Sequence, residues 1–138
     1  MSALTKRCTL DWKGELRLDA DAGDGRRFTI DGNSREGPSP MEALLISLAG
    51  CMAIDLAVIL NKGRAGLSAL SAEIEGTRAE SEPRRFTSIR LHYVVKAGSL
   101  RDGQVERAIQ LSRGKYCSVW NSMRPDIDFQ ITHSIQDS

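Results

Sequence analysis

The 138-residue sequence lacks an excess of charge of either sign, has few cysteines and begins without a long apolar run. Its 19 basic and 18 acidic residues give a net charge of +1, which argues against nucleic acid or an anionic membrane as the main partner, because such binding depends on a positive excess. Three cysteines, an odd number, do not fit a secreted disulfide framework. The opening residues MSALTKRCTLDW contain no apolar core of a signal peptide. We therefore expect a cytoplasmic protein with free thiols.

Several motifs that would announce a cofactor or a metal are also missing. The sequence has no C-x-x-C and no H-x-x-x-H pair, and its two histidines, His92 and His133, fall on separate predicted strands. A zinc-type site would therefore need four scattered ligands to converge. Neither the glycine-rich phosphate loops nor the G-x-S-x-G nucleophile motif occurs. We expect no metal and no cofactor.

The composition, with 41% hydrophobic and 27% charged residues, is typical of a globular protein, and the length suits a single domain spanning residues 1–138. Period-two alternation and turn residues predict strands, and apolar residues at helical spacing predict helices. The order of these elements predicts an α+β fold. The expected strands are 6–12, 15–19, 27–31, 67–77, 89–95 and 127–131, and the expected helices are 40–61, 102–111 and 116–123.

The clearest local signal is the start of the long helix. Ser39 stands at the N-cap, Pro40 at the first helical position and Glu42 at the third, so the serine and glutamate side chains can each accept a bond from the other residue's backbone N–H. The helix should end near Asn61, with Gly63 as a left-handed C-terminal cap.

This helix is apolar on almost every face, with Ser47 and Asp55 as its main interior polar residues. Such a pattern predicts burial on all sides, which one small sheet cannot provide, so a second helix or a partner chain should cover the remaining face. The polar interruptions make it a poor transmembrane candidate. We expect Asp55 to be a hydrogen-bonded group on the helix face.

Each cysteine can be interpreted either as a structural residue or as a reactive thiol. Cys51 lies in mid-helix on an apolar face, where a free cysteine commonly packs as a small hydrophobe, and activation of its thiol would need an arginine from elsewhere. Glu42 faces the opposite side of the helix, so it is better read as a cap than as a partner of this thiol. Cys117 lies at or near the start of a short helix, where free N–H groups lower the pKa of a thiol. Cys8, among charges in the first strand, is expected to be incidental.

Several segments taken together resemble the OsmC/Ohr family across nearly the whole chain. The central-helix motif of that family is similar to GPSPMEALL at 37–45 followed by GCMAID at 50–55. The following strand resembles FTSIRLHY at 86–93, the second-cysteine motif resembles KYCSV at 115–119, and the last strand resembles ITH at 131–133. Both cysteine motifs occur in the family's order.

The resemblance implies an intertwined α+β homodimer with antiparallel sheets around long buried central helices. It also implies a thiol peroxidase in which Cys51 attacks an organic hydroperoxide and Cys117 resolves the product to a disulfide. An external thiol would reset the pair, with no nucleic acid or membrane as partner. The alternative is a module that binds a small molecule or lipid, or senses redox state, without catalysis.

One position departs from the pattern of the best-studied hydroperoxide reductases of this family. They carry a glutamate ten residues before the first cysteine, paired with an arginine of the N-terminal strands, whereas this sequence has Met41 there and Glu42 one residue later. Among the arginines, Arg17 is the first candidate for the activating role, followed by Arg27 and Arg35. The departure suggests a divergent branch of the family.

Overall fold

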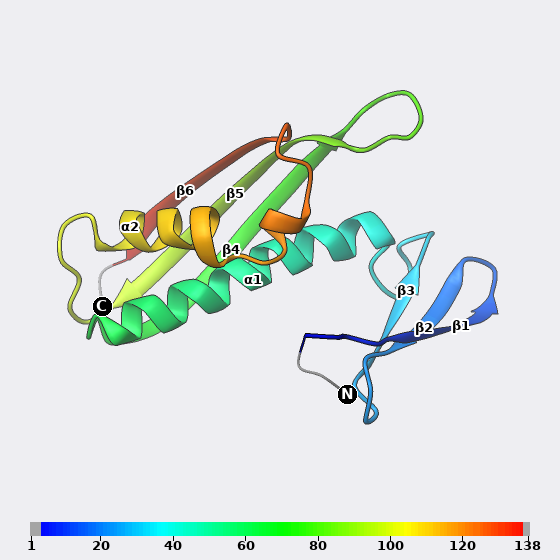
Figure 1. The fold of residues 1–138 in the computed structure, drawn as a ribbon, viewed down its shortest axis with the longest axis horizontal. Coiled ribbons are helices and arrows are strands. Elements are labelled where there is room, and N and C mark those ends of the chain that lie inside the picture. The colour runs from blue at the N-terminus through cyan, green and yellow to red at the C-terminus, as the bar shows by residue number, and fades with distance from the viewer. Residues whose placement is uncertain (1–3, 137–138) are drawn as a thin grey trace. The chain divides into compact units, whose positions relative to one another are not determined.

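The computed structural model describes residues 4–136 as a mixed α+β fold with two sheets (Figure 1), which confirms the predicted class. The chain divides between Leu44 and Leu45 into an N-terminal and a C-terminal compact unit, each described by itself below. That all 138 residues act as one domain stays a prediction. The strands are β1 Thr9–Gly14, β2 Arg17–Asp21, β3 Arg27–Asp31, β4 Leu67–Arg78, β5 Phe86–Ala97 and β6 Asp128–Gln136, and the α-helices are α1 Pro40–Lys62 and α2 Gln104–Leu111.

The N-terminal unit contains an antiparallel meander in the order β1-β2-β3. Its side chains bury little: of its three strands, only Ala20 and Asp31 are buried, Leu18 and Ile30 are half-buried, and the other large apolar residues are exposed. The Asp31 carboxylate accepts the N–H groups of Asn33 and Glu36 and so organises the loop before α1; these bonds hold its pKa below the ordinary value. The exposed apolar residues of the meander are Leu10, Trp12, Leu16 and Phe28.

The start of α1 is the predicted capping box. The backbone N–H of Glu42 donates to Ser39 Oγ at 3.2 Å, and Glu42 Oε1 accepts the Ser39 N–H at 2.9 Å. The Ser34 hydroxyl and the Ser39 backbone N–H both donate to the Glu42 carboxylate and lower its pKa. Glu42 is therefore a cap, as the sequence predicts.

Replacing the capping hydroxyl should destabilise the protein measurably. We expect Ser39→Ala to lower the free energy of unfolding by about 1 kcal/mol, because the Glu42 N–H loses its acceptor. Urea denaturation measures this, with Ser99→Ala, an exposed serine outside any helix or strand, as the control. An unchanged midpoint for Ser39→Ala would contradict the capping account.

The C-terminal end of α1 corrects one prediction. The residue in the left-handed region is Arg64, with φ of 60°, and not Gly63. The N–H groups of Arg64 and Ala65 donate to the carbonyls of Asn61 and Leu60, which is the Schellman pattern. Gln104 approaches Gly63 closely, so a Cβ at position 63 would lie 2.5 Å from Nε2, and this flexible end of the glutamine would have to shift.

Two faces of α1 differ in their exposure to solvent, although both are apolar in sequence. Within the chain a stripe at four-residue spacing is buried, formed by Leu48, Met52, Leu56 and Leu60. On another face Ile46, Ile54 and Val58 are 59%, 67% and 48% exposed, so the single chain leaves this face uncovered, and its covering by a partner chain stays a prediction. By length and composition α1 could also span a membrane, a test that core helices of other proteins pass.

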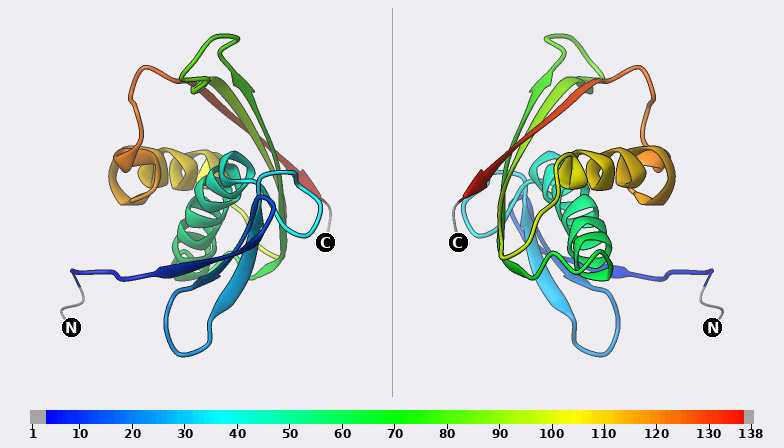
Figure 2. Two further views of the ribbon diagram at one scale, coloured as in Figure 1. Left: turned by 90° about the vertical axis from the view of Figure 1, so that its right-hand side faces the viewer. Right: turned by 90° about the vertical axis from the view of Figure 1, so that its left-hand side faces the viewer.

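The C-terminal unit is built on a sheet in the order β4-β5-β6. The central strand β5 pairs antiparallel with β4 but parallel with β6, so the expectation of antiparallel sheets is wrong for this sheet. Its side chains alternate, and the odd-numbered residues from Ile89 to Ala97 are buried. Figure 2 shows α1 and α2 on the same face of this sheet. The parallel pairing requires a crossover, and the chain from 98 to 127 that contains α2 supplies it.

The segment after α2 differs from the single short helix expected at 116–123. A π-helical turn spans Ser112–Tyr116, and a 3-10 turn spans Trp120–Ser122. Cys117 lies between them with extended backbone, at φ −73° and ψ 100°. The Trp120 ring packs on Phe129 at 4.5 Å between centroids, and the Arg113 guanidinium lies over both rings. This packing fixes the second-cysteine segment to the start of β6.

Candidate functional site

Folding places the Cys51 and Cys117 side chains near each other, close enough that the Cys51 thiol helps to raise the pKa of Cys117. Cys51 comes from the middle of α1 and Cys117 from the segment between α2 and β6, 66 positions later in the sequence. Both are free thiols; Cys51 is half-buried, whereas Cys117 has no exposed surface. The third cysteine, Cys8, is exposed and belongs to the N-terminal unit. A small solute can therefore reach the site through Cys51 but not through Cys117.

Every backbone group of Cys117 is hydrogen-bonded. Its N–H donates to the carbonyl of Ser112 at 2.7 Å, and its carbonyl accepts the backbone N–H and the side-chain amide of Asn121. Its Sγ accepts the Trp120 N–H at 3.3 Å. These four bonds leave the side chain little freedom, so the position of this thiol is set by the turns around it.

Tyr93, on β5, lies near both thiols. It is fully buried, and its hydroxyl donates to the carbonyl of Ala49 in α1 at 2.6 Å. Burial raises the pKa of this phenol well above its ordinary value, and the nearby groups of Cys117, Cys51 and Asp55 raise it further. The tyrosine thus stays protonated and ties α1 to the sheet beside Cys51. The strand alternation predicts its burial, but nothing in the sequence marks it as a neighbour of the thiols.

The pKa of the Cys117 thiol moves in the opposite direction from the prediction. Burial is the main cause that raises it, from 9.0 to about 11, and the Cys51 thiol adds to the rise. The N–H groups of Trp120 and Val119 lower it, as expected at the start of a helical turn, but a three-residue turn is too short to offset burial. Because folding raises this pKa, the neutral thiol stabilises the fold below pH 9, and that contribution is lost as the pH rises from 9 to 11.

A direct titration tests this inversion. In the variant with both Cys8→Ser and Cys51→Ser, Cys117 is the one remaining thiol of the sequence, and its ionisation is followed by the ultraviolet absorbance of the thiolate. We expect a midpoint above 9.0, because burial of Cys117 persists when the Cys51 thiol is gone. The same variant unfolded in urea gives the reference. A folded midpoint at or below the unfolded one would mean that the helical turn, and not burial, controls this thiol.

Asp55 is hydrogen-bonded, as predicted. Its Oδ2 accepts the hydroxyl of Ser112, a fully buried residue, at 2.7 Å. Beyond it opens a cavity of about 380 Å³ lined by two charged and four mainly apolar side chains. These are Asp55, Val58, Ile59, Lys62, Leu111 and Tyr116. This cavity lies along α1 one turn beyond Cys51, and Asp55 is the residue that links it to the surroundings of the thiols.

The remaining predicted site residue, Arg17, lies on β2 in the N-terminal unit. There its guanidinium is 4.0 Å from the Glu15 carboxylate, and Nη2 donates to the Lys13 carbonyl at 3.5 Å. Of the other two candidates, Arg27 pairs with Asp21, and Arg35 lies exposed in the loop before α1. A role for Arg17 toward Cys51 stays a prediction.

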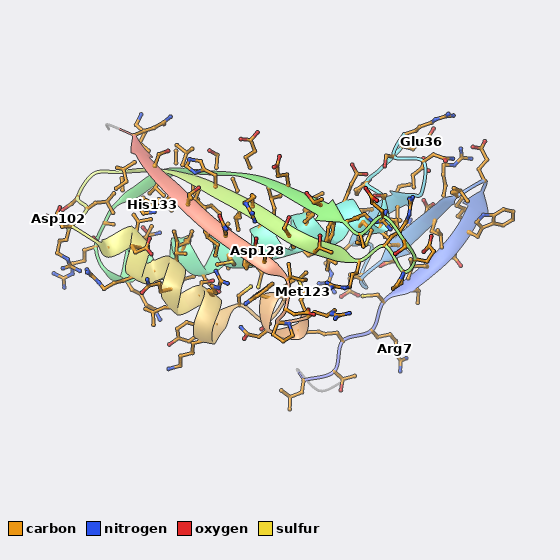
Figure 3. All side chains as sticks on the ribbon, turned by 90° about the horizontal axis from the view of Figure 1, so that it is seen from above. Arg7, Glu36, Asp102, Met123, Asp128 and His133 are labelled. Carbon is orange, nitrogen blue, oxygen red and sulfur yellow. The ribbon has the colours of Figure 1, made fainter. Side chains whose placement is uncertain are left out.

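The histidines have structural surroundings. His92 on β5 contacts the hydroxyls of Thr132 and Ser134, on the sheet face opposite Tyr93. His133 on β6 lies 3.7 Å from Glu106 of α2, and Figure 3 marks its place on the strand. Within residues 4–136 no group of three or more His, Cys, Asp and Glu side chains is arranged to hold a metal ion.

The fold is α+β, and it places a cysteine of a long apolar helix beside a cysteine of the crossover segment. These two features define a class of two-cysteine α+β proteins, and known proteins of that class are similar to this chain. The family described as OsmC-like protein matches residues 31–132, so the chain belongs to the OsmC-like family. It is 39% identical over 126 residues to Protein YhfA of Escherichia coli, covering 91% of this chain and 92% of that protein.

Solved structures share the fold. A hypothetical protein from Aquifex aeolicus superposes with a TM-score of 0.87 at 28% identity, covering 97% of this chain and 98% of that one. An organic hydroperoxide resistance protein OsmC from Legionella pneumophila gives a TM-score of 0.71 at 16% identity, covering 97% of this chain and 99% of that one. The second likeness concerns the fold alone.

Proposed function

We propose that this protein is a cysteine-based peroxidase that reduces organic hydroperoxides to alcohols. The observation that carries the proposal is the proximity of the half-buried Cys51 to the fully buried Cys117. The accessible thiol is suited to meet the substrate, and the enclosed one is suited to capture the oxidised product. Membership of the OsmC-like family supports the same chemistry.

The reaction has three balanced steps. The Cys51 sulfur attacks the outer oxygen of ROOH, the O–O bond breaks, and Cys51 sulfenic acid and ROH form. The Cys117 sulfur then attacks the sulfenic sulfur, so that an S–S bond forms and water leaves. Two external thiols reduce this disulfide and are themselves oxidised to a disulfide. The net reaction converts ROOH and two thiols to ROH, water and one disulfide.

In this proposal Arg17 binds the peroxide and stabilises the departing alkoxide. A guanidinium suits the task, because its fixed fork of donors remains charged and can meet both oxygens. In the family, the glutamate orients the arginine, and the arginine supplies the positive charge. With Met41 at the glutamate position, Arg17 is held less firmly but its charge is still present. Glu42, occupied in the cap of α1, is not available as a substitute.

The substrates are apolar hydroperoxides, and the active form is a homodimer. The cavity beside Asp55 has an apolar lining formed by Val58, Ile59 and Leu111, which favours a hydrocarbon body over hydrogen peroxide. Apolar side chains are exposed in both compact units, on one face of α1 and on the β1-β2-β3 meander. A second chain is the partner that would cover such surfaces in a family of intertwined dimers.

One observation favours a second candidate, a non-catalytic module that binds a small molecule or lipid or senses redox state. Met41 stands where the peroxidases of the family carry their glutamate. Such a module would use the same cavity, and its thiols would be oxidised once without being recycled.

Peroxide consumption separates the two candidates. Reduced protein is mixed with cumene hydroperoxide and an excess of a dithiol, either dithiothreitol or dihydrolipoate, and the remaining peroxide is measured. The peroxidase proposal expects many equivalents consumed per chain and faster consumption of cumene hydroperoxide than of hydrogen peroxide. Consumption that stops at one equivalent with both dithiols would favour the sensing module, and faster turnover of hydrogen peroxide would refute the apolar substrate.

A further inference from the structure

Ser112 connects three parts of the C-terminal unit. Its backbone N–H donates to the carbonyls of Ala108 and Ile109 and closes α2. Its carbonyl accepts the N–H of Cys117 at 2.7 Å, and its hydroxyl donates to Asp55 Oδ2 on α1 at 2.7 Å. The residue has no exposed surface. The Ser112 side chain therefore attaches the segment that carries Cys117 to the helix that carries Cys51.

The attachment lies next to the thiols. Asp55 follows Cys51 by four residues, which places both side chains on the same face of α1 one turn apart. Cys51, Cys117 and Asp55 all lie near enough to influence the hydroxyl of Tyr93. A bond from a buried hydroxyl to a carboxylate is among the stronger side-chain hydrogen bonds, and few alternatives are open to it at a fully buried position.

We propose that Ser112 and Asp55 form a positioning pair that holds Cys117 against Cys51 and so sets the ease with which the disulfide closes. The inference rests on the proposed thiol chemistry, but it concerns a different property, the effective concentration of one thiol at the other. Neither residue is one of the two reacting thiols. Their bond acts through the π-helical turn Ser112–Tyr116, whose last hydrogen bond is the one from the Cys117 N–H to the Ser112 carbonyl.

A dithiol redox equilibrium tests the pair without any peroxide. The protein is equilibrated with mixtures of oxidised and reduced dithiothreitol, so that closing the Cys51–Cys117 disulfide reduces one oxidised dithiothreitol. We expect Ser112→Ala to lower the equilibrium constant for closure about tenfold to a hundredfold, the range for losing a hydrogen bond to a charged group. The potential of the pair would rise accordingly. Ser118→Ala, an exposed serine beside Cys117, is the matched control and should leave the constant unchanged.

Variants of the carboxylate keep the test decisive if Ser112→Ala folds poorly. Asp55→Asn retains an oxygen acceptor of the same shape and should lower the constant only a fewfold, whereas Asp55→Ala should match Ser112→Ala. The two alanine changes together should be no worse than either alone, because both remove the same bond. Equal constants for wild type, Asp55→Ala and Ser112→Ala, or additive losses in the double variant, would overturn the proposal.

Stopped reactions with cumene hydroperoxide distinguish this proposal from the peroxidase itself. In Ser112→Ala we expect the rate of Cys51 sulfenate formation to stay within about twofold of wild type, while disulfide formation slows and more Cys51 is trapped as sulfenate. An equal slowing of both steps would indicate general disruption and contradict the positioning role. If the wild type formed the Cys51–Cys117 disulfide with oxidised dithiothreitol but formed no sulfenate with peroxide, the peroxidase proposal would be refuted. The positioning role of Ser112 and Asp55 would still hold.

Discussion

Replacing Cys51 with serine is expected to abolish peroxide turnover, with a loss of about three orders of magnitude or more, because the hydroxyl is a far weaker nucleophile than the thiolate. Cys51 is the half-buried member of the pair, and Cys117, which remains, is enclosed and stays protonated at neutral pH. The measurement is the initial rate of cumene hydroperoxide consumption with excess dithiol. Far-ultraviolet circular dichroism of the same preparation verifies the fold.

Cys8→Ser is the matched control, since this exposed cysteine lies in the N-terminal unit and takes no part in the proposed chemistry. It should retain the wild-type rate. If Cys51→Ser kept a substantial part of the activity, the assignment of Cys51 as the attacking group would be wrong. If Cys8→Ser lost activity instead, the reactive thiol would have been misplaced altogether.

The second large effect is expected for Cys117→Ser. Sulfenate formation at Cys51 should continue, but steady-state turnover at millimolar external thiol should fall about a hundredfold, because an intermolecular thiol replaces one held close to Cys51. The long-lived sulfenic acid should then be oxidised further to sulfinic acid by excess peroxide. Mass spectrometry of the Cys51 peptide after a series of peroxide additions measures both products.

In wild-type protein the same additions should yield a disulfide and little sulfinic acid. If Cys117→Ser turned over at the wild-type rate, an external thiol would be resolving Cys51 directly, and the buried cysteine would have only a packing role. If wild type and Cys117→Ser accumulated sulfinic acid at equal rates, Cys117 would not protect Cys51.

Local signals in the sequence predicted those parts of the fold that depend on neighbouring residues. The Ser39–Glu42 cap forms as expected because both bonds lie within one turn of chain. The strand 27–31 is observed at the predicted bounds, and the alternation of 89–95 correctly indicates the buried side of β5. Such features depend on periodicity and turn chemistry and need no knowledge of distant contacts.

The errors arise where distant residues decide the outcome. The left-handed position at the end of α1 is Arg64, and the amide of Gln104 from another helix donates to the Gly63 carbonyl at 3.4 Å. The raised pKa of Cys117 follows from complete burial and from a thiol 66 positions away. Neither effect could be calculated from the turn propensity of residues 115–119.

The candidate site was predictable only in part. The sequence indicates the two cysteines and Asp55 as candidate site residues, because each is unusual in its segment. The sequence does not indicate Tyr93 or Ser112, because a tyrosine in a strand and a serine after a helix are ordinary. The importance of these two residues depends on what they contact in the fold. The exposed face of α1 shows the same limit, since an apolar sequence does not say whether the chain itself or another chain covers it.

The most direct test of the account is a disulfide map of the protein after one equivalent of cumene hydroperoxide. Remaining thiols are blocked with an alkylating agent, and the unreduced protein is digested and examined by mass spectrometry. The account predicts a chain lighter by two hydrogens, a linked pair of peptides containing Cys51 and Cys117, and an alkylated Cys8. Oxygen added to Cys51 without a link, a link between two chains, or three unmodified thiols would contradict it.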